Sequence, residues 1–164
     1  MKRLADWISL QVRAYAEEDY AQILSYQLPE EQAIYTSMPQ IIIETFSRDE
    51  NNLPFVVYAR DNLVGCFALH TRQAHMYGIE NPHALLLKSF SIDARYQKRG
   101  HALETLRALP DLTKQYFPDK NEIVLTVHHT NAPARHLYLK AGFLDKGLRY
   151  EGEYGEELIF HYAL

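Results

Sequence analysis

The sequence predicts a single domain built on an α/β or α+β sheet with helical crossovers. Strand-like apolar runs and segments of helical periodicity follow one another in the order β, helices, β-β-β, α, β, α, β-β. The chain has 164 residues, of which 47% are hydrophobic, and this is enough to bury one sizeable core. No internal repeat or low-complexity linker divides it. We therefore expect residues 1–164 to form one domain.

The expected strands are apolar or alternating runs bounded by turn signals. Asp61 and Asn62 lie between two such runs and predict a β-hairpin. The run ALLLKSFSI is almost continuously apolar, which is typical of a strand near the middle of a sheet. The expected strands cover residues 7–15, 55–60, 63–71, 84–92, 122–127, 143–150 and 155–164.

Three helical segments are expected in the N-terminal half. Residues 16–27 have acidic side chains at the front and apolar residues at helical spacing. Pro29 opens a second segment, residues 29–38, at a position where proline is tolerated. Pro39 interrupts this segment, and a short helix is expected at residues 40–46.

Two further helices are expected in the C-terminal half, after a loop at residues 72–83. The first begins near Arg99 and carries leucines at three-residue spacing. Pro110 is expected to break or kink it, or to restart a helix as its first residue. The second covers residues 131–142, with Asn131 placed as its N-terminal cap.

Composition and charge argue against several classes of protein. The formal net charge of −4 does not suggest a nucleic-acid-binding protein. The single cysteine, Cys66, cannot form an internal disulfide and is expected to pack within an apolar strand. The segment MKRLADWISL lacks the apolar core of a signal peptide, and no run approaches transmembrane length. We therefore expect a cytoplasmic protein with no nucleic-acid partner and no membrane partner.

The stretch YQKRGHA, residues 96–102, predicts a pyrophosphate site at the start of a helix. The N–H groups of a first helical turn have no partners within the helix and carry the positive end of its dipole. A phosphate must approach this backbone closely, and the small residues Gly100 and Ala102 leave room for it. Lys98 and Arg99 add positive charge. The plainer alternative is that this stretch is only the start of a helix, with a glycine that eases the turn into it.

This arrangement resembles the GCN5-related N-acetyltransferase (GNAT) superfamily, whose members bind acetyl-CoA through Q/R-x-x-G-x-G/A between the fourth strand and the third helix. Gln97, Gly100 and Ala102 match this motif, with Ala102 replacing the second glycine. Ile92 lies five residues before Gln97, where the family has an apolar residue that closes the strand. The stretch NAPARHLYLKAGF, residues 131–143, matches N-x-x-A-x-x-L-Y-x-x-x-G-F.

The resemblance implies a mixed, mostly antiparallel sheet with flanking helices and a parallel central strand pair that splays apart. The pair would be formed by residues 84–92 and 122–127. The pantetheine arm of acetyl-CoA would enter the gap, and its pyrophosphate would rest on the backbone N–H groups of the loop. The residues expected to bind acetyl-CoA are Phe90, Ile92, Gln97, Lys98, Arg99, Gly100, His101, Ala102 and Asn131.

The resemblance also implies direct attack of an amine on the thioester, with Tyr138 pointing at the sulfur. A phenol can donate a proton to the leaving thiolate, so Tyr138 is the expected general acid. Some relatives use a glutamate in the fourth strand as general base, but ALLLKSFSI contains no carboxylate. His128, at the end of the next strand, is the expected base because histidine exchanges protons near neutral pH. His70 is a second candidate, and Ser89 and Ser91 could hold a water chain.

The expected acceptor is a primary amine of a small molecule, bound between residues 25–38 and 150–160. Both segments carry acidic and tyrosine side chains, which can attract a cationic polyamine, aminoglycoside or lysine side chain. A solvated acidic rim is the plainer interpretation of most of them. The side chains concerned are Glu30, Glu31, Tyr35, Tyr150, Glu151, Glu153, Tyr154, Glu156 and Glu157.

Two alternatives to a small-molecule acetyltransferase follow from the same features. One is a non-catalytic module that binds or senses acyl-CoA, and the other is a protein N-acetyltransferase. No metal is expected, because no spacing such as H-E-x-x-H supports a zinc site. A homodimer is the default expectation for the assembly.

Overall fold

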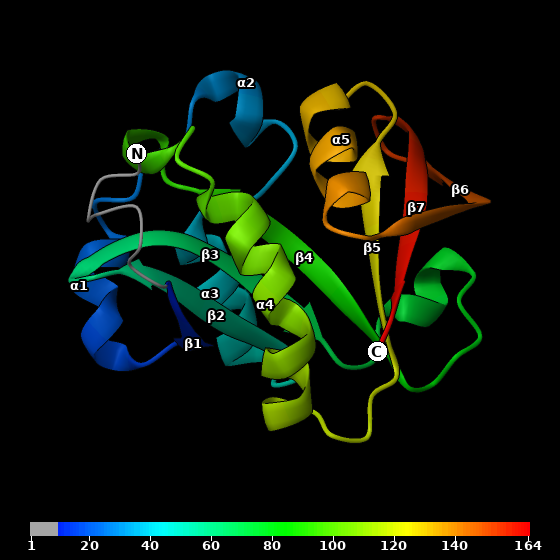
Figure 1. Cartoon of the computed structure of the whole chain (residues 1–164), viewed down its shortest axis with the longest axis horizontal. Coiled ribbons are helices and arrows are strands. Elements are labelled where there is room, and N and C mark those ends of the chain that lie inside the picture. The colour runs from blue at the N-terminus through cyan, green and yellow to red at the C-terminus, as the bar shows by residue number, and fades with distance from the viewer. Residues whose placement is uncertain (1–9) are drawn as a thin grey trace, which may run out of the picture.

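The computed structural model describes residues 10–164, and Figure 1 shows the course of the chain. The strands are β1 (Gln11–Ala14), β2 (Asn52–Ala59), β3 (Asn62–His70), β4 (Ala84–Ile92), β5 (Glu122–His128), β6 (Leu144–Gly152) and β7 (Gly155–Ala163). The α-helices are α1 (Tyr20–Ile23), α2 (Glu30–Ala33), α3 (Pro39–Arg48), α4 (His101–Tyr116) and α5 (Ala132–Lys140). The 3-10 turns are η2 (Glu17–Asp19), η3 (Ala74–Tyr77) and η4 (Ala94–Tyr96).

The seven strands form one sheet in the order β1-β2-β3-β4-β5-β7-β6. Its strand pairs are antiparallel except β4 and β5, which run parallel. The expected fold class, a mixed and mostly antiparallel sheet with one parallel central pair, is therefore confirmed. None of the helices between residues 10 and 164 is long and apolar enough to cross a membrane.

The parallel pair separates along its length, as the diverging β4 and β5 in Figure 1 show. Their ladder ends at Leu86 and Val124, although β4 continues to Ile92 and β5 to His128. Beyond Leu86 the edge of β4 that faces β5 therefore has no strand partner. Buried backbone groups need hydrogen-bond partners, so an open gap in mid-sheet is a place for an extended ligand to bind.

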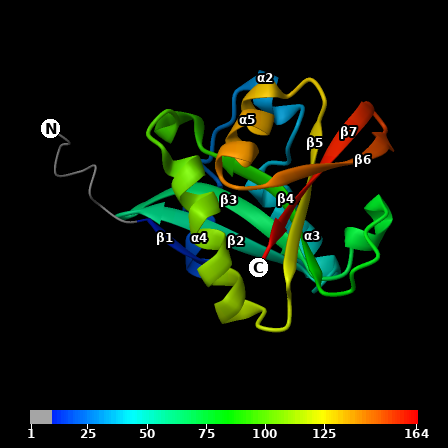
Figure 2. The ribbon, with the colours of Figure 1, turned by 45° about the vertical axis from the view of Figure 1, so that its right-hand side comes forward.

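The two faces of the sheet are covered by different helices, which Figure 2 shows from the side. Phe55 and Val57 of β2 face the core beneath α4 and α5, whereas Val56 and Tyr58 face α1 and α3. This alternation follows from the two-residue period of a strand. Cys66 lies in the second core, and burial raises the pKa of its thiol to about 12.

A β-bulge in β4 lies beside the gap. Cys66 pairs with Ser91 and Ala68 pairs with Lys88, so two residues of β4 oppose Phe67 alone. Ser89 takes up the irregularity with a φ of +54°. A non-glycine residue in this left-handed region is uncommon, and bulges often redirect a strand next to a functional site.

The N-terminal helices are shorter than the sequence predicts. Residues 16–27 do not form one helix, because η2 and α1 end by Leu24 and the chain from Ser25 to Gln27 is bonded to Asp93 and Arg95 instead. Within residues 29–38 only α2 is helical. Met38 is extended, as the residue before a proline usually is, and Pro39 becomes the first residue of α3.

Pro110 neither breaks nor restarts the helix that contains it, and the kink expected as the alternative stays a prediction. α4 is continuous from His101 to Tyr116. Leu106, Leu109 and Leu112 are buried on both sides of Pro110. A proline inside a helix costs about 3 kcal/mol, and each buried leucine contributes about 1.5–3 kcal/mol, so packing against the sheet outweighs the break.

Smaller differences concern turns and strand ends. The hairpin between β2 and β3 turns at Arg60 and Asp61, one residue before the expected pair, and Arg60 has a φ of +55°. The expected loop at 72–83 contains the turn η3. The expected strand at 7–15 is found as β1, and its first residues lie outside the described part of the chain.

Candidate active site

The loop between η4 and α4 presents free backbone N–H groups to solvent at the mouth of the gap. Lys98 and Gly100 both have positive φ, 62° and 84°, which turns the chain sharply before α4. Among the described residues, none accepts a hydrogen bond from the backbone N–H groups of residues 98–102. The exposed side chains of Lys98 and Arg99 flank these donors. The loop thus has the donors, charge and helix terminus that an anionic phosphate group needs.

Gln97 has a bracing role in this loop. Its Nε2 donates to the carbonyl oxygen of Ile92 at 2.9 Å and to Oε1 of Gln32 at 2.8 Å. The amide of Gln32 donates back to Gln97 Oε1 at 3.2 Å. The side chain of Gln97 therefore ties the loop to the end of β4 and to α2.

The next two residues expected to bind acetyl-CoA, His101 and Ala102, begin α4 and are half-buried. Burial lowers the pKa of His101. The charge of Glu104 raises this pKa and that of Arg99 lowers it, and the net effect is a lowered pKa. The imidazole is therefore neutral at pH 7. The positive charge of the loop therefore comes from Lys98 and Arg99 rather than from His101.

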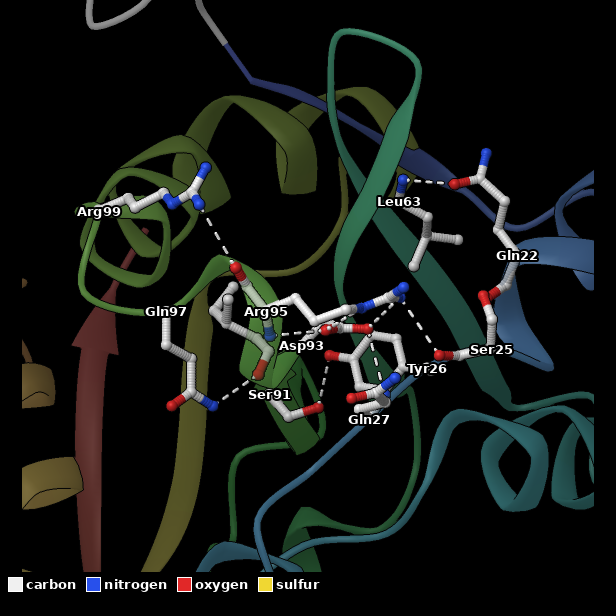
Figure 3. A network of polar contacts seen from close by, with 11 residues as sticks. Gln22, Ser25, Tyr26, Gln27, Leu63, Ser91, Asp93, Arg95, Gln97 and Arg99 are labelled. Carbon is white, nitrogen blue, oxygen red and sulfur yellow. Dashed lines mark hydrogen bonds and ion pairs between the residues drawn. The ribbon is translucent and has the colours of Figure 1, made fainter.

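A buried carboxylate fixes the end of β4 just before the loop, as Figure 3 shows. Asp93 is fully buried and accepts hydrogen bonds from the backbone N–H groups of Gln27 and Arg95. The guanidinium of Arg95 adds bonds of 3.0 and 2.9 Å and also reaches the carbonyl oxygen of Ser25. Burial alone would raise the pKa of Asp93, but the hydrogen bonds from Arg95 and Gln27 outweigh it and lower this pKa.

Phe90 and Ile92 lie on β4 beyond its last pairing with β5, and Tyr138 lies on α5. Phe90 and Tyr138 pack at the edge of the core beneath α4 and α5, and Ile92 is buried. The ring of Tyr138 meets that of Phe143 edge-on, with centroids 5.9 Å apart. Its hydroxyl has no hydrogen-bond partner among the described side chains and backbone groups. Burial raises the pKa of Tyr138 to about 12, so the phenol keeps its proton at neutral pH.

Asn131 caps α5 by accepting a hydrogen bond from the backbone N–H of Ala134 at 3.3 Å. The capping role foreseen for this residue is therefore present. Its expected contact with acetyl-CoA stays a prediction.

His128 lies on the opposite face of the sheet from Tyr138. Leu125 and Val127 of β5 face α4 and α5, so Thr126 and His128 point to the other face. His128 and Phe90 each lie four residues beyond the last paired residues of the parallel strands, which places both at the mouth of the gap. The site therefore carries a phenol on one face and an imidazole on the other.

The hydrogen bonds of His128 fix its tautomer. The backbone N–H of Thr130 donates to Nδ1 at 3.2 Å, so Nδ1 is an acceptor. Nε2 lies 2.8 Å from the carbonyl oxygen of Tyr154, so Nε2 carries the proton. The Thr130 hydroxyl, 2.6 Å from Nδ1, consequently donates to it and accepts from Tyr35, whose hydroxyl oxygen is 3.1 Å away. A chain of hydrogen bonds thus runs from Tyr35 through Thr130 to His128.

The other candidates for a general base have different environments. His70 pairs with Leu86 near the start of β4, and its Nε2 lies 2.7 Å from Asp49 Oδ2. Burial lowers the pKa of His70. Ser91 is buried and bonded to the hydroxyl of Tyr26 at 2.8 Å. Of the candidates foreseen, His128 is the one at the mouth of the gap with a hydrogen-bonded path to the surface.

The two segments expected to bind the acceptor do come together at His128. Tyr35 follows α2, and its ring centroid lies 5.7 Å from that of His128. Tyr154 lies in the β6–β7 turn and contacts the same imidazole through its carbonyl. Thr130 joins Tyr35 to His128, and Gln32 joins α2 to Gln97. Both were missed in the sequence because neither belongs to a motif with catalytic chemistry.

A splayed parallel strand pair beside a loop of free N–H groups defines a class of proteins that bind a long, phosphate-bearing ligand across a sheet. The model of the acetyltransferase (GNAT) family matches residues 13–143. The chain therefore belongs to the GNAT family, and it is an N-acetyltransferase by that membership. The resemblance found in the sequence is confirmed.

The chain is similar to several known acetyltransferases over nearly its whole length. An uncharacterized N-acetyltransferase of Bacillus subtilis, YbbJ, is 37% identical, and the match covers 92% of this chain and 94% of YbbJ. A spermine/spermidine N(1)-acetyltransferase of the same organism is 28% identical over 89% of this chain and 95% of that protein. An aminoglycoside acetyltransferase solved with coenzyme A and kanamycin shares the fold, with a TM-score of 0.76 at 17% identity over 94% and 95% of the two chains.

Replacing Gly100 with alanine is expected to weaken acetyl-CoA binding about tenfold, because the new methyl group points into the open space above the free N–H groups. The left-handed φ of +84° makes the substitution cost about 1–2 kcal/mol of stability as well. Gly78→Ala is a matched control, since Gly78 has a φ of +79° and equally open surroundings. Titration calorimetry with acetyl-CoA should show a loss of affinity for Gly100→Ala alone. Equal affinities would make Gly100 a turn residue only.

Proposed function

We propose that this chain transfers the acetyl group of acetyl-CoA to a primary amine of a small molecule, by direct attack of the amine on the thioester. The observation that carries the proposal is the placement of three features around one gap. These are the loop of free N–H groups, the unbonded phenol of Tyr138 on one face, and the hydrogen-bonded imidazole of His128 on the other.

The residues beside the gap fit acetyl-CoA. The N–H groups of residues 98–102 and the charges of Lys98 and Arg99 suit a pyrophosphate, and Gly100 leaves space above them. The unpaired edge of β4 beyond Leu86, at Phe90 and Ile92, can bond to the amide groups of the pantetheine arm. When bound, the ligand supplies the reactive acetyl thioester.

His128 removes the proton of the acceptor ammonium through the two hydroxyl groups. The ammonium gives a proton to Tyr35 Oη, Tyr35 gives its own to Thr130 Oγ1, and Thr130 gives its own to His128 Nδ1. The amine is then neutral and His128 is cationic, with Nε2 still bonded to the carbonyl of Tyr154. Alkyl ammonium groups have a pKa of about 10.4, so this step is needed at neutral pH. Tyr138 protonates the departing thiolate on the other face. The nitrogen that attacked loses its second proton as the amide forms, and this proton returns Tyr138 to its neutral form.

A small-molecule acceptor is supported by several similar proteins whose names state one, whereas a ribosomal-protein-S5-alanine acetyltransferase that shares the fold is named for a protein acceptor. The matching Bacillus subtilis enzyme is named for spermine and spermidine, and the aminoglycoside acetyltransferase was solved with kanamycin. The alternatives are a protein N-acetyltransferase and a non-catalytic acyl-CoA sensor. The proton path from Tyr35 to His128 favours an enzyme, because a sensor has no use for it.

The proposal is tested by thiol release from acetyl-CoA with a panel of polyamines, aminoglycosides, amino acids and peptides. Acetyl-CoA should also raise the melting temperature, since a ligand at about one hundred times its Kd adds about 2.7 kcal/mol to stability. Thermal stabilisation without turnover of any amine would identify a sensor. Turnover of peptides alone would identify a protein acetyltransferase.

Replacing Thr130 with valine should lower kcat/KM about tenfold at neutral pH, because it removes the hydroxyl between Tyr35 and His128 and a water can replace that hydroxyl only in part. The defect should shrink as the pH approaches the amine pKa of about 10.4, where the acceptor is already neutral. Thr130→Ser should restore most of the rate. A pH–rate profile of Thr130→Val that matches the parent at every pH would remove the hydroxyl chain from the mechanism.

A further inference from the structure

A cavity on the acceptor face lies between α3 and strands β2 to β4. Its polar lining consists of Ser37, Thr45, Asn52, Lys88 and Ser89. Lys88 and Ser89 belong to β4 directly before Phe90, so the cavity continues down the sheet from the mouth of the gap. An acceptor whose amine lies at the gap can therefore place its other end here.

The cation in this cavity has no counter-ion. Lys88 is half-buried, and its Nζ donates to the neutral Oε1 of Gln73 at 2.7 Å. No ion pair between described residues involves Lys88. Asp49, the carboxylate that acts on it, is already bonded to His70 at 2.7 Å. Burial lowers the pKa of Lys88 and Asp49 only opposes this, which shows that the charge is poorly compensated.

A second group in the cavity is also unsatisfied. Asn52 is 3% exposed, and its Oδ1 is buried with no hydrogen-bond partner among the described residues. Buried amides nearly always have partners, so an unpaired amide lining a cavity indicates a polar ligand. The hydroxyls of Ser37 and Ser89 are likewise free of protein partners in the described structure. One cation and several neutral hydrogen-bonding groups suit an anion better than they suit a cation.

We infer that this cavity binds a carboxylate of the acceptor, so that the substrate is a primary amine carrying an acid group, such as an amino acid. The carboxylate accepts hydrogen bonds from Lys88 and the serine hydroxyls. The amide of Asn52, flipped so that Nδ2 takes the place of Oδ1, donates to it as well. This inference rests on the proposed function and names its substrate class. It also separates this chain from enzymes whose acceptors carry only positive charge, because Lys88 repels a second ammonium group.

The test compares pairs of amines that differ only in a carboxylate: lysine with cadaverine, and ornithine with putrescine. We expect wild-type kcat/KM to be about ten- to hundredfold higher for the acid-bearing member of each pair, the range for a hydrogen bond to a charged group. Lys88→Gln should abolish this preference, mainly through KM, and Lys88→Arg should keep most of it. Lys114→Gln, an exposed lysine on α4, is the control for the loss of one positive charge. Thermal melts establish that each variant is folded.

The possible results separate the inference of a carboxylate site from the proposed function. Equal kcat/KM within every pair, unchanged by Lys88→Gln, would overturn the inference and leave the proposed function standing. If none of the amines causes thiol release from acetyl-CoA, the proposed function is overturned. In that case the inference is decided by ligand-induced melting shifts. A shift by lysine in the wild type and not in Lys88→Gln would support a carboxylate site, and no shift by any acid-bearing amine would overturn it.

Discussion

Replacing Tyr138 with phenylalanine is expected to lower turnover about 10²–10⁴-fold, the usual range for loss of a general acid. The substitution keeps the ring and its edge-on contact with Phe143 and removes only the hydroxyl. Since the phenol has no protein partner among the described residues, its loss leaves no hydrogen bond broken in the fold. Acetyl-CoA affinity should change little, because the loop at residues 98–102 remains intact.

The pH dependence of this variant separates chemistry from packing. With a pKa of about 12, Tyr138 stays protonated across any practical assay, so its own ionisation does not shape the pH profile. A thiolate leaves unassisted once the pH passes the free thiol pKa of about 8.5, so the defect should narrow above that value. Tyr162→Phe is the matched control, since Tyr162 packs against the same Phe143 with centroids 5.4 Å apart. Single-turnover rates near those of the parent at neutral pH would exclude Tyr138 as the acid, whereas steady-state rates could hide the loss behind product release.

Replacing Asp93 with asparagine should destabilise the fold by about 1–3 kcal/mol, the cost of leaving hydrogen-bond donors without their buried acceptor. The neutral amide cannot accept the hydrogen bonds that Gln27 and Arg95 now give to both carboxylate oxygens. One of its own N–H groups must instead face a donor. The network in Figure 3 joins β4 to the chain before α2, so its loss should loosen the acetyl-CoA loop as well.

Urea unfolding of this variant at several pH values also tests whether the pKa of Asp93 is lowered by folding. The folded pKa of Asp93 lies below its unfolded value of about 3.9, so the stabilisation is complete above that pH. It is lost as the pH falls through the folded pKa. Asp93→Asn should therefore show a flatter fall in stability under acid. Asp111→Asn, at an exposed site on α4, should change stability by less than about 0.5 kcal/mol. Similar losses for both variants would show that the buried charge is unimportant.

The main lines of the fold could be predicted because its strands are dense in apolar residues. β4 and β5 were placed within one residue, since their apolar runs end at polar or turn signals. The prediction of one helix over residues 16–27 was wrong because two distant residues, Asp93 and Arg95, bind the chain where the helix would have continued. The predicted break at Pro110 is absent for a similar reason, because the leucines around it are buried against the sheet. In both places tertiary contacts outweigh local preference.

The candidate site also has parts that could be predicted from the sequence and parts that could not. The turn before α4 could be predicted because glycine, alanine and two cations stand together in one short stretch, and its binding of acetyl-CoA stays a prediction. The path from Tyr35 to His128 could not be predicted, because it joins two segments that lie far apart in the sequence. Lys88 did leave a signal, as a single cation inside an apolar strand that also lacks a carboxylate. Its meaning emerges only with the cavity beside it.

The placement of Cys66 makes the chain its own reporter of local opening. Its sulfur is the one thiol in the sequence, and it lies 3% exposed between the sheet and the layer of α1 and α3. With a pKa of about 12 the thiol is also almost entirely protonated at neutral pH, and alkylating reagents attack the thiolate. Labelling therefore requires that this layer lifts from the sheet or that the whole domain unfolds. A labelling rate above the rate of global unfolding would measure local opening of the layer of α1 and α3.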